Sequence, residues 1–172
     1  GSGITGGWAA KELTEKGLKV LMVERGRPVE HRKDYVGEGV PTWKLPFRNA
    51  MNYQLVEDQY FIQRQCYAFG DTSKNFFMND RDYPYSTPEG KPFSWIRGNQ
   101  LGGKSLLWAR QSYRLSDYDF TANLKDGHGV DWPIRYKDLE PWYSYVERHA
   151  GISGSKENIP VLPDSEFLPP FE

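Results

Sequence analysis

The chain opens on a run of glycines, Gly1-Ser2-Gly3-Ile4-Thr5-Gly6, whose spacing suits the binding of a pyrophosphate. Glycines let the backbone approach a phosphate closely, and the start of a helix offers free N–H groups and a favourable dipole. Glu24 follows 18 residues after Gly6, close to the roughly 20-residue spacing at which a carboxylate binds the ribose hydroxyls of a dinucleotide. A carboxylate there disfavours a 2′-phosphate, so NADP is the least favoured ligand. Taken alone, Glu24 would more often be a solvated acid at the end of a strand.

A second glycine-rich segment, Arg97-Gly98-Asn99-Gln100-Leu101-Gly102-Gly103-Lys104-Ser105, could contact a flat ring or a phosphate. Gly102 and Gly103 carry no side chain that would block the approach, and Ser105 offers a hydroxyl near a helix start. An ordinary Gly-Gly turn is the alternative interpretation. Trp108, just beyond the segment, is a further candidate for cofactor binding. Its alternative interpretation is an ordinary aromatic residue of the core.

The first motif is followed by the elements that a dinucleotide site needs. Residues 6–16 are predicted to form a helix because small and apolar side chains recur at helical spacing, and Gly17 suits its end. Residues 19–24 form an apolar run typical of a buried parallel strand. Together they predict an α/β fold: an incomplete Rossmann-like domain with a parallel sheet, whose first strand would precede Gly1 and is missing from this sequence.

The rest of the chain gives weaker signals. Short strands are expected in residues 63–69, 93–97 and 111–115, and Ser116 suits the cap of a short helix. Pro141 suits the first turn of a helix that ends near His149, with Gly151 just past its end. We expect residues 1–172 to be one partial domain. Residues 27–92 would be an irregular, aromatic-rich excursion, and residues 152–172 would begin a connection to a further domain.

Composition excludes several classes of function. The 22 basic and 23 acidic residues give a net charge of −1, so nothing favours nucleic acid or an anionic membrane surface. No apolar run is long enough to span a membrane. Cys66 is the one cysteine, and the three histidines are scattered, so no disulfide framework or metal site is predicted. Both cytoplasm and periplasm remain open as compartments.

The motifs resemble those of a known enzyme family. The spacing GxGxxGxxxAxxLxxxGxxVxxxExG, met from Gly1 to Gly26, is similar to the signature of flavoproteins that bind the ADP half of FAD. The segment RGNQLGGKSLLW resembles the second signature of the glucose–methanol–choline oxidoreductases. Asp131-Trp132-Pro133 and Pro141-Trp142-Tyr143 resemble the branch of that family that contains sugar and sugar-acid dehydrogenases and pyranose oxidase.

The resemblance implies a FAD-dependent enzyme that oxidises an alcohol or sugar CH–OH group by hydride transfer to flavin. Leu107 stands where pyranose oxidase carries the histidine that bonds FAD, so the cofactor would be non-covalent. The family's catalytic histidine and its partner, a histidine or an asparagine, would lie outside this chain, and we assign no catalytic residue. The predicted cofactor-binding residues are Gly1, Gly3, Ile4, Thr5, Gly6, Glu24, Arg25, Arg97, Asn99, Gly102, Gly103, Ser105 and Trp108.

Two other functions compete with this one. An NAD-linked dehydrogenase would use the first motif and Glu24 equally well, although the second motif favours FAD. A non-catalytic fragment without cofactor is the third interpretation, because the first strand and the catalytic pair are both missing. The expected partners are a small alcohol or sugar and the remainder of the same protein.

Overall fold

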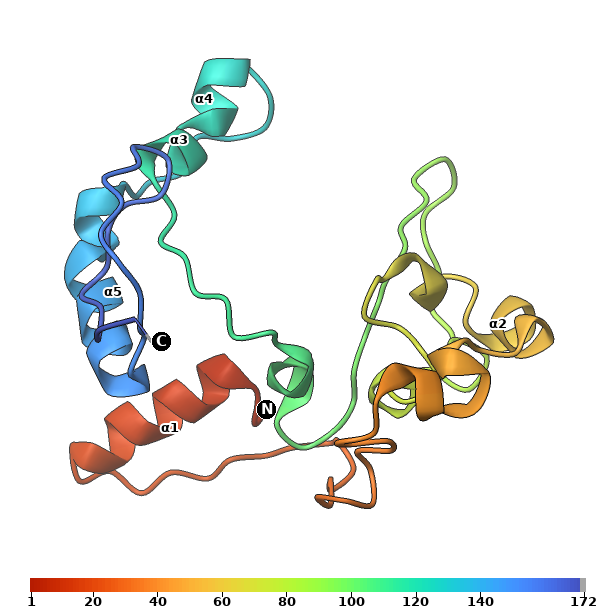
Figure 1. Cartoon of the computed structure of the whole chain (residues 1–172). Helices are drawn as coiled ribbons and strands as arrows, with labels where there is room; N and C mark the ends of the chain where they lie inside the picture. The colour runs from red at the N-terminus through yellow and green to blue at the C-terminus, as the bar shows by residue number, and fades with distance from the viewer. Residues whose placement is uncertain (171–172) are drawn as a thin grey trace. The chain divides into compact units, whose positions relative to one another are not determined.

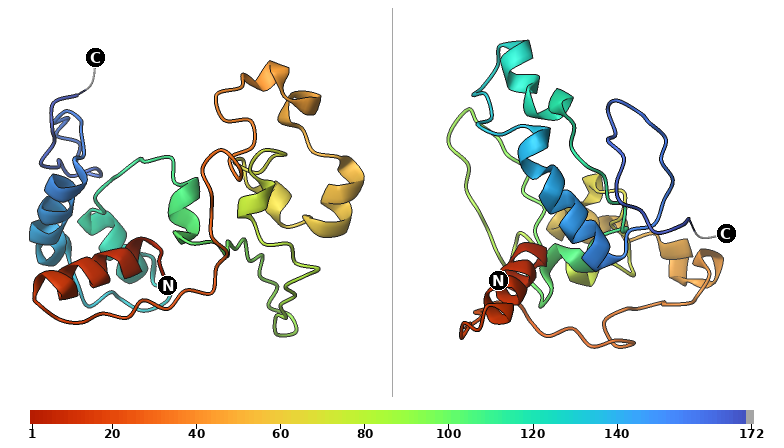
Figure 2. Two further views of the ribbon diagram at one scale, coloured as in Figure 1. Left: turned by 90° about the horizontal axis from the view of Figure 1, so that it is seen from below. Right: turned by 90° about the vertical axis from the view of Figure 1, so that its left-hand side faces the viewer.

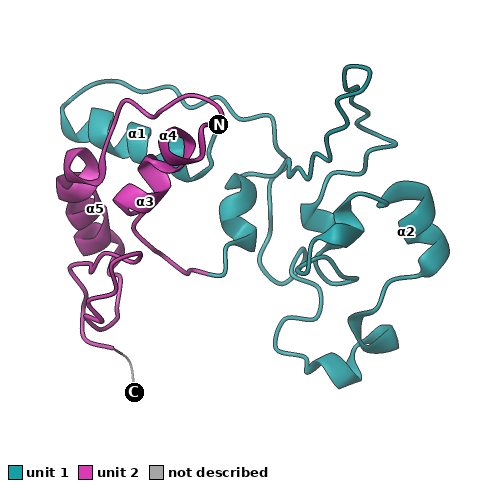
Figure 3. Ribbon diagram, turned by 90° about the horizontal axis from the view of Figure 1, so that it is seen from above, with its two compact units in different colours: residues 1–109 teal, residues 110–172 magenta. Residues whose placement is uncertain are grey.

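The computed structural model describes residues 1–170 and separates into two compact units, Gly1–Ala109 and Arg110–Glu172 (Figures 1 and 3). Both units are built from helices, short 3-10 turns and extended loops. Unit 1 contains α1 (Ile4–Glu15), η1 (Thr42–Lys44), η2 (Pro46–Asn49), α2 (Tyr53–Gln59), η3 (Gln63–Gln65), η4 (Lys74–Phe76) and η5 (Gly103–Leu107). Unit 2 contains α3 (Asp117–Phe120), α4 (Ala122–Asp126) and α5 (Tyr136–Ala150).

The first helix confirms the prediction from periodicity, although α1 begins two residues earlier than expected. Gly17 ends it with a φ of +79°, a conformation that glycine adopts without steric penalty. The N–H of Gly17 donates to Thr14 O, and that of Leu18 donates to Leu13 O. These bonds satisfy carbonyls that a helix end leaves without intrahelical partners.

The predicted α/β fold with a parallel sheet is wrong. Residues 1–170 contain only isolated bridges. The parallel ones join Arg27 to Gln100 in unit 1 and Ser153 to Leu168 in unit 2. Residues 19–24 are extended but unpaired, and Leu21 and Val23 are 87% and 73% exposed. Figures 1 and 2 draw this segment as a plain tube after α1. An apolar run becomes a strand only where neighbouring segments bind its N–H and C=O groups, and none of the described residues does so here.

The other predicted strands are also absent from the described residues. Residues 63–69 form η3 and a turn, while residues 93–97 and 111–115 are extended without ladder partners. Aromatic contacts build the small core of unit 1 around η4. Phe76 and Phe77 are 4% and 6% exposed, with ring centroids 5.1 Å from those of Tyr35 and Phe69 respectively.

The helices of unit 2 agree with the sequence signals at their ends. The Asp119 carboxylate accepts from the backbone N–H of Ser116 at 2.7 Å and from its hydroxyl at 2.9 Å, which confirms Ser116 as the cap of α3. Gly151 ends α5 with a φ of +71°. However, α5 begins at Tyr136, so Pro141 lies inside the helix rather than in its first turn. The chain after α5 folds back as a loop, visible in dark blue in Figure 2.

A buried ion pair that sequence reasoning missed anchors unit 2. Arg114 and Glu147 expose 3% and 8% of their side chains and make two hydrogen bonds, at 2.8 and 2.6 Å. The guanidinium also donates to Tyr136 Oη at 2.8 Å and to Ser144 Oγ at 3.0 Å. Burial raises the pKa of Glu147, but hydrogen bonds from Arg114 and Ser165 outweigh it and the net pKa is lowered. The hydrogen bonds to Glu147 raise the pKa of Arg114, so both groups are charged.

Candidate functional site

The two glycine motifs, far apart in sequence, come together in unit 1 through a serine. The Ser2 backbone N–H and hydroxyl donate to Glu24 Oε2 at 2.6 and 2.7 Å. The Gly102 N–H in turn donates to Ser2 Oγ at 2.8 Å, across 100 residues of chain. One small side chain therefore joins the first motif, the acid that follows it and the second motif.

Close backbone contacts reinforce this junction and require glycine. A Cβ on Gly6 would lie 1.9 Å from Gly1 O, and a Cβ on Gly26 would lie 2.5 Å from the backbone carbon of Gln100. Both distances are far below van der Waals contact. A Cβ on Gly103 would lie 3.4 Å from Gly3 Cα, so the second motif also lies directly against the first. Gly102 and Gly103 have φ values of +89° and +58°, which the turn before η5 demands.

Glu24 is the electrostatic centre of the junction. Its pKa is lowered from 4.5 to about 2, first by the backbone and side-chain hydrogen bonds from Ser2 and then by the Gly26 N–H. The Gly26 N–H donates to Oε1 at 2.8 Å. The backbone N–H of Arg25 also lowers the pKa of this carboxylate, by a smaller amount. Both hydrogen bonds from Ser2 end on Oε2, whereas Oε1 accepts from Gly26. Glu24 is thus a fixed, ionised acceptor.

The start of α1 fits a phosphate group. The first backbone hydrogen bond of the helix runs from Gly7 N–H to Gly3 O at 2.9 Å, so the amides of Ile4, Thr5 and Gly6 precede the hydrogen-bonded ladder. The first turn contains no acidic residue that would repel an anion. The helix dipole adds a partial positive charge at the same place.

Several other predicted residues do not point to this junction. Arg97 forms an ion pair with Asp80 at 2.8 Å, and its guanidinium lies 4.9 and 4.8 Å from the ring centroids of Tyr85 and Trp95. This contact set gives Arg97 a structural role in unit 1. The Arg25 guanidinium lies 3.8 Å from Met78 Sδ.

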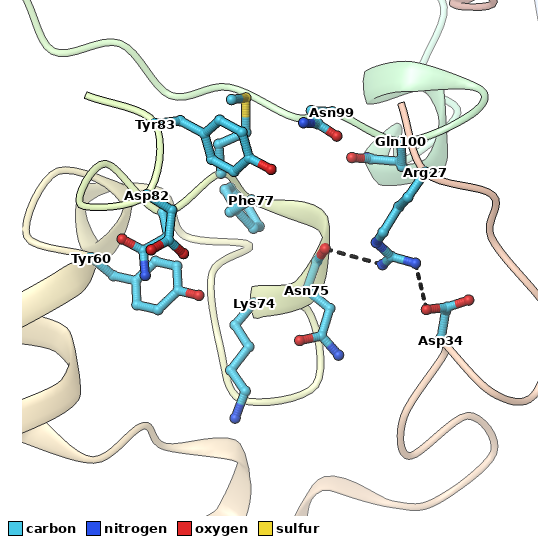
Figure 4. A pocket seen from close by; sticks show the side chains of 12 residues that line it. Arg27, Asp34, Tyr60, Lys74, Asn75, Phe77, Asp82, Tyr83, Asn99 and Gln100 are labelled. Atoms are coloured by element: carbon cyan, nitrogen blue, oxygen red, sulfur yellow. Dashed lines mark hydrogen bonds and ion pairs between the residues drawn. The ribbon is translucent and has the colours of Figure 1, made fainter. Parts of the chain in front are cut away.

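Three predicted residues of the second motif remain. The Ser105 hydroxyl donates to Gly102 O and closes the turn that starts η5. Trp108 is 40% exposed and follows the last residue of η5. Asn99 accepts the Arg27 N–H on its backbone oxygen at 3.2 Å, and its side chain lines a neighbouring cavity of about 320 Å³ (Figure 4).

Sequence reasoning missed three residues that build the junction: Ser2, Gly26 and Gln100. Gly26 is part of the extended glycine spacing, and that spacing was the available signal for it. Ser2 occupies a variable position within the motif, where any small residue would satisfy the pattern. Gln100 is 2% exposed and donates from Nε2 to Gly103 O at 3.1 Å, a role with no sequence signature.

Other kinds of site find no support in residues 1–170. None of their His, Cys, Asp and Glu side chains gather in groups of three or more that could hold a metal ion. None of their helices combines the length and apolar character needed to cross a membrane. His31 pairs with Glu38 at 2.9 Å on the surface, and His149 lies in the last turn of α5.

Comparison with known proteins identifies the class of protein to which this chain is similar. No family model matches the chain. The 6'''-hydroxyparomomycin C oxidase of Streptomyces lividus is 32% identical over 157 residues, which cover 90% of this chain and 22% of that protein. The fructose dehydrogenase large subunit of Gluconobacter japonicus is 26% identical, over 95% of this chain and 28% of its own. The gluconate 2-dehydrogenase flavoprotein of Pantoea cypripedii is 27% identical, over 89% of this chain and 25% of its own.

These homologues are glucose–methanol–choline oxidoreductases of the sugar and sugar-acid dehydrogenase branch. The family resemblance carried by the two glycine motifs is therefore confirmed, at low identity but over most of this chain. The chain spans about a quarter of the length of the curated relatives it matches.

Proposed function

We propose that this chain is part of the FAD-binding portion of an oxidoreductase that acts on the CH–OH group of a sugar or alcohol. The observation that carries the proposal is the contact between the two glycine motifs, made through Ser2 and centred on the ionised Glu24. A single phosphate loop would need only the first motif. Two glycine turns packed against each other suit a ligand with both a pyrophosphate and a flat ring system.

Different residues would bind different parts of the cofactor. The amides of residues 4–6 at the start of α1 would hold the pyrophosphate. The ionised Glu24 carboxylate would accept a ribose hydroxyl, since a charged carboxylate is a strong hydrogen-bond acceptor. The backbone of Gly102 and Gly103 would lie against the ring, because neither residue has a side chain there. When bound, flavin supplies the hydride acceptor.

The relatives support this class of reaction by their names. One is named an oxidase of 6'''-hydroxyparomomycin C, one a subunit of a fructose dehydrogenase, and one a gluconate 2-dehydrogenase flavoprotein. From their names, we take sugars and sugar acids as the proposed substrate class of the whole protein. The cofactor-binding roles of the named residues rest on the geometry of this chain.

Anaerobic reduction of the purified full-length protein tests the proposal. We expect a yellow protein whose flavin absorbance at about 450 nm bleaches on addition of a sugar or sugar acid, with D-fructose and D-gluconate as first probes. A colourless protein that instead reduces NAD with the same substrates would favour the NAD-linked alternative, for which the first motif and Glu24 serve equally well.

A further inference from the structure

A cavity of about 320 Å³ lies beside the second glycine motif, within unit 1 (Figure 4). This volume is at the lower end of the range for small-molecule sites. Tyr60, Phe77 and Tyr83 provide aromatic surface, and amide side chains including Asn75 and Asn99 provide hydrogen-bonding groups. Aromatic faces pack against the C–H groups of a sugar ring. Amides hydrogen-bond to its hydroxyls.

Four polar side chains that line this cavity are free to hydrogen-bond to a ligand. In the part of the chain that the structure describes, nothing hydrogen-bonds to the side chains of Tyr60, Asn75, Tyr83 or Asn99. They offer phenol and amide groups that both donate and accept, as a ring with several hydroxyls requires. A purely apolar ligand would leave them unsatisfied.

The charges of the cavity select among hydroxylated ligands. Arg27 is paired with Asp34 at 2.6 Å, and Lys74 is paired with Asp71 at 2.5 Å, so both cations are already neutralised. Asp82 has no hydrogen-bond or ion-pair partner among residues 1–170. Figure 4 shows Asp82 near Tyr60 and Tyr83, on the opposite side from Arg27 and Asp34. The cavity therefore presents one unpaired negative charge, which disfavours phosphates and carboxylates and favours a cation.

We propose that this cavity binds an amino sugar, with its ammonium group toward Asp82 and its hydroxyls toward the amides and phenols. The sugar ring packs on the aromatic wall. The inference concerns binding alone and requires neither flavin nor turnover. The Asp82 variant separates it from any sugar binding at the catalytic site of the function proposed above.

Saturation-transfer NMR on the purified protein at about pH 6, where an amine of α-amino type is protonated, measures this binding. The probes are D-glucosamine, its neutral counterpart N-acetyl-D-glucosamine, and adenosine. We expect D-glucosamine to bind about 2- to 5-fold more tightly than the neutral sugar, the effect of one solvent-exposed ion pair.

Asp82→Asn should abolish that difference, and Asp58→Asn is the matched control. Neither carboxylate has a partner among the described residues, so neither change removes a contact of the fold. Tyr83→Ala, which removes part of the aromatic wall, should weaken both sugars alike. Equal affinities in the unaltered protein, or no saturation transfer to either sugar, would overturn the proposal. Displacement of D-glucosamine by adenosine would also overturn it, by assigning the cavity to a nucleotide.

Discussion

Ser2 connects the two glycine motifs, although it occupies a variable position of the first motif. Its hydroxyl both donates to Glu24 and accepts from the Gly102 N–H, so it is the shared group of two motifs. Ser2→Ala removes both bonds and leaves the Gly102 amide without that acceptor. We expect the proposed flavin to be retained at least about fivefold less tightly, since each lost hydrogen bond contributes about 1 kcal/mol. Flavin absorbance after exhaustive dialysis measures this. Ser94→Ala is the control, since Ser94 is exposed and has no partner among the described residues.

The acid at the centre of the junction should make unit 1 sensitive to low pH. The pKa of Glu24 is lowered to about 2 in the folded chain, against an ordinary value of 4.5. A carboxylate with a lowered pKa stabilises the fold above its ordinary pKa, and the stabilisation is lost as the pH falls from 4.5 toward about 2. Glu24→Gln should flatten this part of the pH profile of the melting temperature. Glu89→Gln, at an exposed position in a turn, should leave the profile unchanged; a parallel profile for both variants would contradict the role of Glu24.

At the residue scale, the sequence predicts a hydrogen-bond acceptor such as Glu24 better than the residues that hold it in place. Glu24 could be located because its distance from the glycines is set by one helix and one connecting segment. Arg97 could not be placed, since its contacts with Asp80, Tyr85 and Trp95 depend on how residues 80–97 fold as a loop. Nothing in the local sequence of Arg97 distinguishes a cofactor ligand from a structural ion pair.

The close packing of the segment around Gly26 on the second motif gives a prediction about elements. Gly26→Ala would place its Cβ 2.5 Å from the Gln100 backbone, which cannot move as a side chain could. We expect a loss of about 1–3 kcal/mol in the free energy of unfolding, typical of overpacking, together with weaker binding of the proposed flavin.

Gly7→Ala provides the matched control for that substitution. Nothing lies within 4 Å of the Cβ it would add, and the position is inside α1. Alanine should stabilise the helix by roughly 0.5–1 kcal/mol. Urea unfolding followed by circular dichroism compares the two variants. Equal effects would mean that the Gly26–Gln100 contact does not position the motifs.

The ion pair that anchors α5 should dominate the stability of unit 2. Arg114→Met leaves the Glu147 carboxylate buried without its cation, and breaking such a pair costs about 3–5 kcal/mol. Arg148→Met is the control, because Arg148 and Glu166 form a pair that is more than half exposed and contributes about 0–1 kcal/mol. Urea denaturation of each variant gives the free energies. A small effect at Arg114 would show that water reaches the pair.

Element prediction succeeded where the signal is local and failed where it is not. The helix ends at Gly17, Ser116 and Gly151 could be predicted because a cap is determined by a few neighbouring residues. The strand expected in residues 19–24 failed because its hydrogen bonds must come from other segments, and apolar character alone does not provide them. Pro141 led us to place the start of α5 too late. The helix begins at Tyr136, and Pro141 lies inside it without an N–H for the carbonyl four residues earlier.

For the whole protein, the proposed flavin should be released by acid. Leu107, the last residue of η5, has no nucleophile that could bond the cofactor. Acid precipitation of the purified yellow protein should therefore leave the colour in the supernatant. Colour that stays with the pellet would show a covalent link through another residue and would contradict the role assigned to this segment.

The bond between Ser2 and Gly102 also has a consequence for the order of folding. It closes a loop of 100 residues, and the chain entropy lost on closing such a loop directly is about 4 kcal/mol. The contact can form readily only after the intervening residues have compacted around η4, so it is expected late in assembly. By the same reasoning it opens early, and the Gly102 amide should exchange with solvent deuterium sooner than the amides within α1. The proposed cofactor site would then be the last part of unit 1 to form, and a ligand that spans both motifs would stabilise the late contact.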